Sequence, residues 1–155
     1  MTEVYLILAS DTDAEALLSI QKNAFLPLFE SYQDGNLNPY SETLEQMKQH
    51  INEGYFYKIM LNDCLVGGIM ARELEKDMWK LRIIFIEQEF QGKGIAQTAI
   101  GLMEKIHSDV NEWVLDTPHD LYKNHHIYEK CGYVRTSEIT PVNERLALIH
   151  YRKKR

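Results

Sequence analysis

Gln91-Gly92-Lys93-Gly94-Ile95-Ala96 is the stretch of sequence from which the fold is most directly predicted. It follows an apolar run at residues 81–86 and opens a segment, residues 95–107, whose apolar spacing is helical. A strand, a turn with two glycines and a helix start expose backbone N–H groups at the positive end of a helix dipole. Because glycine has no Cβ, an anion can approach that backbone closely. The pattern therefore predicts a site for a phosphate or pyrophosphate group, with Lys93 as a cation at its rim.

Two common phosphate-binding loops fit this stretch badly. A Walker loop needs two glycines with four residues between them, followed by Lys and then Ser or Thr, whereas here Gly94 and Ile95 follow Lys93. The dinucleotide-binding fingerprint needs a third small residue where Gln97 stands. An unrelated α/β protein that binds ATP or NAD is therefore the weaker interpretation.

The composition indicates one globular domain over residues 1–155. The net charge is −6, which argues against general binding of nucleic acid. Only Cys64 and Cys131 are present, so we expect no disulfide framework and a reducing, cytoplasmic setting.

No apolar run is long enough to cross a bilayer and no signal peptide precedes the first strand, so we expect no contact with a membrane. The basic residues 152–155 are expected to form a solvated tail.

Apolar periodicity predicts strands and helices along the whole chain. In the strand at 78–86, Trp79, Leu81, Ile83 and Phe85 are expected to face one side and the residues between them the other. Pro27 is expected to kink or end the first helix, and residues 30–40 to form a loop. The predicted strands are 4–8, 55–61, 64–71, 78–86, 113–116, 133–137 and 146–151, and the predicted helices begin at residues 11–13, 41, 94 and 121. The periodicity thus favours a mixed α/β protein.

Two blocks of sequence resemble one known family. Gln91-x-x-Gly94-x-Ala96 resembles the acetyl-CoA signature of the GNAT superfamily of N-acetyltransferases, and Tyr128-Glu129-Lys130-Cys131-Gly132-Tyr133 is similar to that family's Tyr-x-x-x-Gly-Phe/Tyr segment. The order of the elements, β-α-α-β-β-β-α-β-α-β-β, also looks like the family's order. The resemblance implies a GNAT-type fold, in which a central, mostly antiparallel sheet of about seven strands is splayed at strands 4 and 5 and flanked by about four helices.

The resemblance implies transfer of an acetyl group from acetyl-CoA to a primary amine, by direct attack within a ternary complex. The pyrophosphate of acetyl-CoA is expected on backbone N–H groups, and the pantetheine arm beside the backbone of the fourth strand. Many family members carry an asparagine where this chain has Leu121, so we expect Asn124 to serve the arm instead. The expected cofactor-binding residues are Ile84, Phe85, Ile86, Gln91, Gly92, Lys93, Gly94, Ile95, Ala96, Gln97 and Asn124.

Tyr128 matches the family tyrosine that assists the departing thiolate, and it is the one catalytic residue that the resemblance assigns. A tyrosine with a pKa of about 10 gives its proton to a thiolate of pKa about 8.5 at a cost of roughly 2 kcal/mol. We therefore expect Tyr128 to act chiefly as a hydrogen-bond donor. The general base is left unassigned among Asp116, His119 and Glu87.

No metal site is expected, because neighbouring His125 and His126 diverge on a helix and cannot chelate together. In the family, the acceptor pocket is built largely by segments that correspond to residues 29–40 and 138–145. Their acidic side chains favour a cationic amine. Polyamine, aminoglycoside, amino acid and peptide N-terminus all stay open as acceptors. An alternative function also stays open, in which the GNAT fold senses acyl-CoA without turnover. A homodimer stays open as the oligomeric state.

Overall fold

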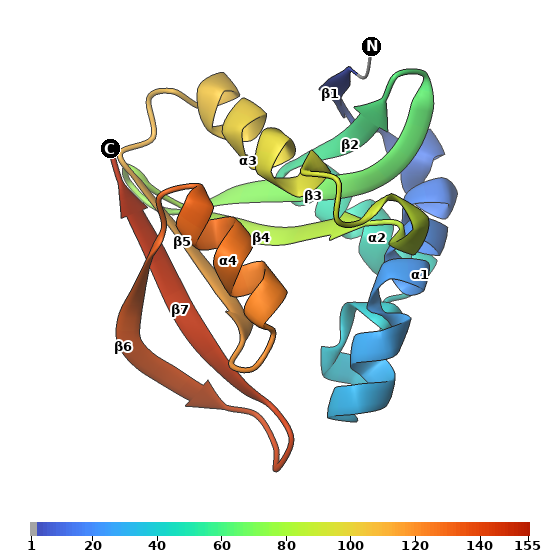
Figure 1. The fold of residues 1–155 in the computed structure, drawn as a ribbon. Coiled ribbons are helices and arrows are strands. Elements are labelled where there is room, and N and C mark those ends of the chain that lie inside the picture. The colour runs from blue at the N-terminus through green and yellow to red at the C-terminus, as the bar shows by residue number, and fades with distance from the viewer. Residues whose placement is uncertain (1–2) are drawn as a thin grey trace.

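The computed structural model describes residues 3–155, in which seven strands form one mixed sheet and four α-helices pack against it (Figure 1). The sheet order is β1-β2-β3-β4-β5-β7-β6. This arrangement confirms the predicted mixed α/β fold. The strands are β1 (Val4–Leu8), β2 (Tyr55–Leu61), β3 (Cys64–Glu75), β4 (Met78–Ile86), β5 (Glu112–Pro118), β6 (Val134–Pro141) and β7 (Ala147–Lys154), and the helices are α1 (Ala14–Tyr32), α2 (Leu44–Glu53), α3 (Ile95–Ile106) and α4 (Tyr122–Lys130).

The sheet opens between β4 and β5, as the resemblance implied. These two strands are parallel and pair only where residues 78–80 meet residues 112–114, whereas the other neighbouring strands are antiparallel. Beyond Lys80 the two strands diverge. Figure 1 shows the V-shaped opening between β4 and β5, with α4 lying over β5. The last residues of β4, from Leu81 to Ile86, therefore pair with β3 on one side and have no strand on the other.

A β-bulge at Arg82 corrects the predicted faces of β4. Ile83 and Leu81 pair with the consecutive residues Met70 and Ala71 of β3, so Arg82 is the extra residue in β4. A bulge reverses the side-chain alternation along its strand. Leu81 accordingly packs with the core under α3, whereas Ile83 and Phe85 pack with the core under α1 and α2. The prediction that Trp79, Leu81, Ile83 and Phe85 share one face of the sheet was wrong. Strict alternation of side chains assumes that β3 and β4 pair without a bulge.

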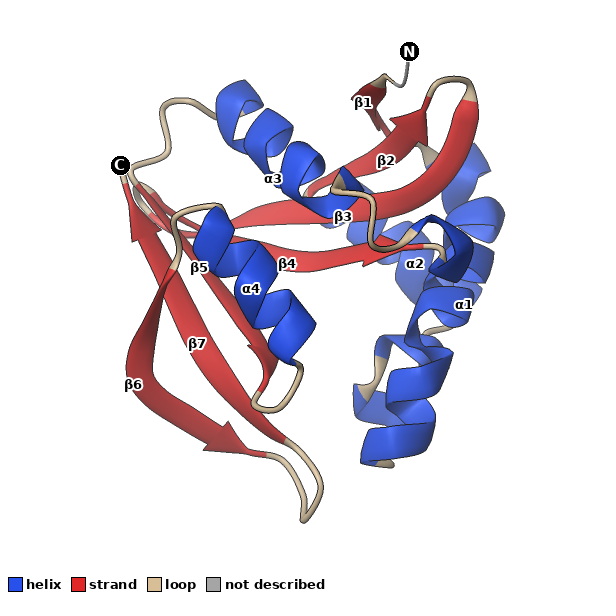
Figure 2. Cartoon of the chain, in the orientation of Figure 1, coloured by secondary structure: helices blue, strands red, loops and turns tan. Residues whose placement is uncertain are grey.

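The helices cover the two faces of the sheet and bury two apolar clusters (Figure 2). The core on one face joins α3 and α4 to the sheet and includes Ile100, Met103 and Leu115. The core on the other face joins α1 and α2 to β2, β3 and β4 and includes Leu17 and Met47. Since α1 and α2 pack mainly on the first half of the sheet, the same face of β5 is left free to line a cleft.

Pro27 lies inside α1, which continues to Tyr32 and is not ended by it. Proline has no N–H, so the carbonyl of Asn23 loses its helical partner. The side-chain amide of Gln88 donates to that carbonyl at 2.6 Å, and the side chain of Asn23 accepts from the backbone N–H of Gln88 at 2.9 Å. This replacement partner comes from a distant turn, so the sequence alone left open whether Pro27 kinks or ends the helix.

The basic residues near the C-terminus form part of a strand, whereas the prediction was a solvated tail. Residues 152–154 belong to β7 and pair with β5. Arg152 forms an ion pair with Glu112 at 2.6 Å, and Lys153 forms one with Glu104 at 2.7 Å. The charges of this segment are thus used within the fold. No helix within residues 3–155 is long and apolar enough to cross a membrane.

The close approach of β3 and β4 beside the open edge gives a test of this architecture. A Cβ on Gly67 lies 2.1 Å from the carbonyl oxygen of Phe85. We therefore expect Gly67→Ala to lower the free energy of unfolding, measured in urea, by about 2–3 kcal/mol. The control Gly101→Ala adds a Cβ to α3 with nothing within 4 Å, so it should raise stability by about 0.5–1 kcal/mol. Equal stability of Gly67→Ala and the unaltered protein would contradict the described contact.

Candidate active site

The glycine turn before α3 has the geometry of an anion site. Gly92 and Gly94 have φ values of 77° and 79°, in the left-handed region that glycine tolerates, and Gly94 is the N-cap of α3. A Cβ on either glycine meets nothing within 4 Å, so the space in front of the turn is open. The first N–H groups of a helix have no partner within it, and here no side chain caps them. The turn thus has the open backbone and the uncapped helix start on which the prediction of a phosphate site depends.

Gln91 joins this turn to two other parts of the site. Its side-chain amide donates to the carbonyl of Ile86 at 2.7 Å, at the end of β4. Its side-chain oxygen accepts from the ammonium of Lys123 in α4 at 3.2 Å. The predicted pyrophosphate turn, the open end of β4 and the first turn of α4 are thus brought together. Lys123 was not among the predicted residues, although its place just before Asn124 was visible in the sequence.

A cleft of about 500 Å³ lies where β4 and β5 diverge. Its lining includes Lys80 to Ile84 of β4 and Asp116 to Pro118 of β5. Leu121, which precedes α4, and Asn124 and Tyr128 of α4 complete the side next to β5. Phe25, Leu28 and Tyr32 of α1 form the wall opposite. Of the predicted cofactor residues, Ile84 and Asn124 therefore line this cleft, while residues 91–97 lie at the start of α3. Ile86 and Phe85 are buried at the end of β4.

Tyr128 contributes to the cleft from within the core. Its side chain is 6% exposed. Burial raises the pKa of its hydroxyl, and the charge of a Cys131 thiolate raises it further. Thr117 lines the same cleft, is 1% exposed, and its hydroxyl has no hydrogen-bond partner within residues 3–155. A buried hydroxyl without a partner costs about 1–3 kcal/mol, which a polar ligand in the cleft can recover.

Asp116 is the one candidate base that lines the cleft. Its carboxylate accepts from Lys80 at 2.8 Å, and the Nδ1 atom of His150 lies 2.5 Å from its other oxygen. Both oxygens are therefore engaged. The other two candidate bases do not line the cleft. His119, which follows β5, contacts the backbone of Ala147 at the start of β7. Glu87 begins the turn after β4.

Arg82, the bulge residue, reaches from the cleft into a buried polar cluster. Its guanidinium lies 3.0 Å from Nε2 of His50 and 3.9 Å from the carboxylate of Glu42. Glu42 also contacts His50 at 2.7 Å and accepts a hydrogen bond from Gln21. Burial alone raises the pKa of Glu42, but the hydrogen bonds and charges of these neighbours outweigh it, and the pKa lies below its ordinary value. The carboxylate is thus held in its ionised form.

The end of the cleft is closed by contacts between distant segments. The Tyr32 hydroxyl donates to Asp120 at 2.6 Å, which links α1 to the turn before α4. Asn143, in the β6–β7 turn, donates to the carbonyl of Tyr32 at 3.0 Å. Of the predicted acceptor segments, residues 29–40 contribute five lining residues, whereas residues 138–145 contribute only Val142. The acidic Glu138 and Glu144 are exposed and do not line the cleft.

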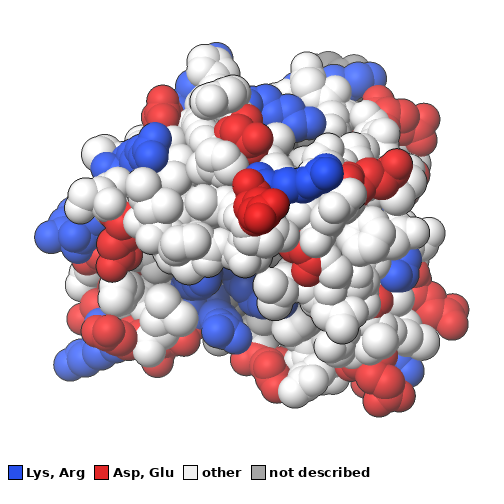
Figure 3. Space-filling view, turned by 90° about the horizontal axis from the view of Figure 1, so that it is seen from below, with Lys and Arg blue, Asp and Glu red and all other residues white. Residues whose placement is uncertain are grey.

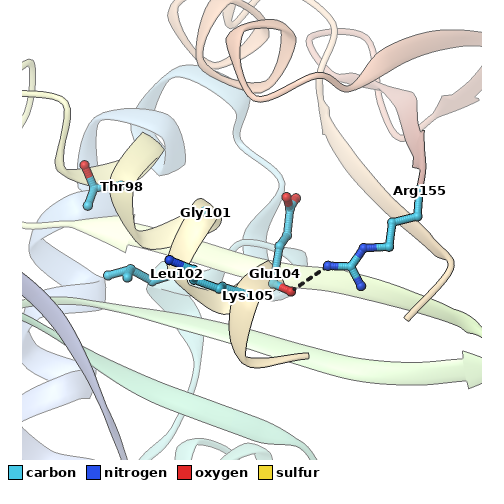
Figure 4. A pocket seen from close by; sticks show the side chains of 6 residues that line it. All are labelled: Thr98, Gly101, Leu102, Glu104, Lys105 and Arg155. Carbon is cyan, nitrogen blue, oxygen red and sulfur yellow. Dashed lines mark hydrogen bonds between the residues drawn. The ribbon is translucent and has the colours of Figure 1, made fainter. Parts of the chain in front are cut away.

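A second hollow, of about 420 Å³, lies along α3 near the C-terminus (Figure 4). Arg155 reaches across it and donates to the backbone carbonyl of Glu104 at 3.3 Å. None of the predicted site residues lines this hollow. Within residues 3–155, no three His, Cys, Asp or Glu side chains are grouped so that they could hold a metal ion.

The sequence and the fold together identify the family. A sequence profile described as the acetyltransferase (GNAT) family matches residues 20–133. The chain belongs to the GNAT acetyltransferase family. The matched range runs from α1 through the glycine turn to Tyr133, and so includes both blocks on which the resemblance was based. No curated protein sequence matches the chain significantly.

Solved GNAT-type structures share the fold over nearly the whole chain. The PaiA N-acetyltransferase of Thermoplasma acidophilum, solved with coenzyme A, is 17% identical, with a TM-score of 0.76 and coverage of 99% of both chains. The spermidine N-acetyltransferase of Vibrio cholerae, solved with CoA and spermine, is 20% identical, with a TM-score of 0.76 and coverage of 97% of this chain and 95% of that one. The Microcin C7 self-immunity acetyltransferase MccE, solved with acetyl-CoA and AMP, is 16% identical, with a TM-score of 0.76 and coverage of 99% and 93%. At these identities the likeness establishes the fold.

Four cleft residues were missed by the sequence analysis as members of a site. Lys80, Arg82 and Thr117 line the cleft directly, and His150 orients Asp116 from β7. A signal was available for two of them, because Lys80 and Arg82 are cations inside an otherwise apolar strand. Thr117 and His150 gave no signal, since their positions depend on the pairing of β5 with β7.

The polar cluster around Glu42 predicts how the GNAT domain responds to acid. Because the folded pKa of Glu42 is lowered, its ionisation stabilises the fold at neutral pH, and this contribution is lost as the pH falls below about 4. Glu42→Gln should therefore be less stable than the unaltered protein near neutrality and should lose less stability on acidification. Urea unfolding at several pH values measures this. The exposed Glu45→Gln is the control, and it should keep the full acid dependence. Parallel profiles for the unaltered protein and Glu42→Gln would contradict the described role.

Proposed function

We propose that residues 1–155 act as one acetyltransferase domain that transfers an acetyl group from acetyl-CoA to a primary amine. The observation that carries the proposal is the juxtaposition of three features at one opening of the sheet. These are the unpaired edge of β4, the glycine turn at the start of α3, and Tyr128 in the cleft beside them. The amine attacks the thioester carbon directly, the carbon–sulfur bond breaks, CoA leaves as the thiolate, and the proton that the nitrogen loses passes to water.

The chain's own residues suit each part of acetyl-CoA. The backbone N–H groups of residues 91–97 would hold the pyrophosphate, since the two left-handed glycines leave the turn open. The edge of β4 at Ile84, Phe85 and Ile86 would pair with the amides of the pantetheine arm. Asn124 lies on α4 one turn before Tyr128, on the same side of that helix, and lines the cleft with it. This placement supports the expected role of Asn124 beside the arm.

Tyr128 would donate a hydrogen bond to the departing thiolate. Its raised pKa makes full proton transfer to sulfur less favourable than the ordinary values imply, so the hydroxyl stays protonated throughout the step. A donor aimed at the atom on which negative charge develops stabilises the transition state more than the ground state. Tyr128 thus works as an electrostatic stabiliser rather than as a general acid.

The compared structures support the proposal in two respects. Each of the three was solved with CoA or acetyl-CoA, and two of them are named as N-acetyltransferases. A primary amine is therefore the acceptor class we adopt for this chain. Both Cys64 and Cys131 are free thiols, which fits the reducing cytoplasm in which we expect the enzyme to work.

Binding of acetyl-CoA is the first test of this proposal. A ligand present at about 100 times its Kd adds roughly 2.7 kcal/mol of stability, which raises the unfolding midpoint by about 5–10 °C for a chain of this size. We expect that rise with acetyl-CoA and none with ATP or NAD. No rise at millimolar acetyl-CoA would overturn the proposal.

Removal of one hydroxyl tests the role of Tyr128. We expect Tyr128→Phe to lower kcat by about 10²-fold while leaving the Kd of acetyl-CoA nearly unchanged, because the hydrogen bond forms to the thiolate only as it departs. The control is Tyr133→Phe, which removes a buried hydroxyl bonded to Glu104 outside the cleft and should keep kcat. Release of free CoA thiol measures both. An unaltered kcat for Tyr128→Phe would exclude the hydroxyl from the reaction.

A further inference from the structure

The floor of the cleft carries two cations. Lys80 and Arg82 of β4 are the basic residues that line it. Figure 3, seen from below, shows basic side chains gathered in a hollow of that face, with acidic side chains around its margin. This distribution differs from the acidic pocket that the sequence of the loops favoured.

The carboxylates at the cleft already have partners in the protein. Asp34 accepts from the side-chain amide of Asn38 at 3.1 Å, and Asp120 accepts from the Tyr32 hydroxyl at 2.6 Å. Asp116 is engaged on both oxygens, as described above. A polycationic acceptor would therefore have to share these carboxylates with the partners that they already have.

The guanidinium of Arg82, in contrast, has N–H groups that are not used in hydrogen bonds to oxygen or nitrogen of the described residues. A guanidinium carries five N–H donors, and the short polar contact of this one is to Nε2 of His50 at 3.0 Å. The carboxylate of Glu42 is 3.9 Å away, and the sulfur of Met70 is also at 3.9 Å. Nε2 of His50 lies 2.7 Å from Glu42 as well, and one ring nitrogen cannot donate to Glu42 and accept from Arg82 at once. Arg82 thus keeps further N–H groups for which residues 3–155 supply no oxygen or nitrogen acceptor at hydrogen-bond distance.

We propose that Arg82, with Lys80 beside it, binds an anionic group of the acceptor, so that the acceptor is a small amine that also carries a carboxylate. A planar guanidinium with free N–H groups binds a carboxylate through two parallel hydrogen bonds, and this fixes where the amine of the same molecule lies. The inference rests on the proposed acetyl transfer and names the acceptor of that site. Arg82 holds the acceptor and takes no part in making or breaking bonds.

The size and walls of the cleft define the rest of the acceptor. The cleft of about 500 Å³ has to hold the acceptor together with the thioester end of acetyl-CoA, so the space for the acceptor suits a molecule of amino-acid size. Leu28, Leu37 and Leu148 line it together with Phe25, so the part of the acceptor beyond its charged end meets apolar walls. An amino acid with an apolar side chain combines the amine, the carboxylate and the apolar body.

The experiment compares each of the apolar L-amino acids with its C-terminal amide, which keeps the amine and removes the negative charge. Release of CoA thiol gives kcat/KM, and calorimetry on the CoA-loaded protein gives the Kd of the same pairs. We expect the best amino acid to exceed its amide by about 10–100-fold in both quantities. Arg82→Met should abolish this preference without weakening the binding of CoA. The matched control Arg135→Met removes an exposed arginine of β6 outside the cleft and should keep it.

The outcomes separate this inference from the proposed function. Equal or better use of the amides, or a preference for spermidine, would overturn the inference while leaving acetyl transfer intact. A preference for the carboxylate that persists in Arg82→Met would also overturn it. If no amine released CoA, acetyl transfer would fail, and calorimetry would still decide the inference by whether the amino acids bind more tightly than their amides. Thermal unfolding of Arg82→Met verifies that the variant is folded.

Discussion

The site depends on the loss of a strand partner along β4 after Lys80. Backbone N–H and C=O groups that face no strand must find other partners, because leaving them unsatisfied in a protein interior costs about 1–3 kcal/mol each. The chain meets part of this need itself, since the side chain of Gln91 donates to the carbonyl of Ile86. The rest of the edge from Leu81 onwards is open towards the cleft. The same opening that weakens the sheet thus creates the space in which two substrates can meet.

The bulge at Arg82 divides β4 into a structural half and a functional half. Before it, Trp79 and Leu81 pack under α3 as in an ordinary strand, while Lys80 pairs with Asp116 on the other face. At the bulge, a charged side chain is directed towards α2 and the cleft. After it, Ile83 and Phe85 anchor the strand against α1 and α2. The inserted residue therefore exchanges the faces of the side chains that follow it and places a cation at the cleft.

Local sequence patterns were enough for the fold, and they were not enough for the cleft. The glycine turn, the Tyr128 block and the order of the elements depend on residues close together in the chain, and the resemblance they carry implied the splayed sheet correctly. The bulge depends on the register between β3 and β4, which no local pattern encodes. The continuation of α1 past Pro27 depends on Gln88, 61 residues later in the chain. Lys80 and Arg82 were visible as cations in an apolar strand, but their common place on the cleft floor required the three-dimensional structure.

The hydrogen bonds between Asn23 and Gln88 have a mechanical consequence. Asn23 lies on the helix that ends at Tyr32, and Tyr32 closes the far end of the cleft through Asp120. Gln88 begins the short 3₁₀ turn Gln88–Phe90, which leads directly into the glycine turn at residues 91–94. The two hydrogen bonds therefore join the helix that lines the cleft to the glycine turn, at a point where Pro27 has already removed a bond from the helix. Because Asn23 precedes Pro27 and Tyr32 follows it, a pivot of α1 at Pro27 would move the Tyr32 end of the helix while the Asn23 end stays joined to the glycine turn.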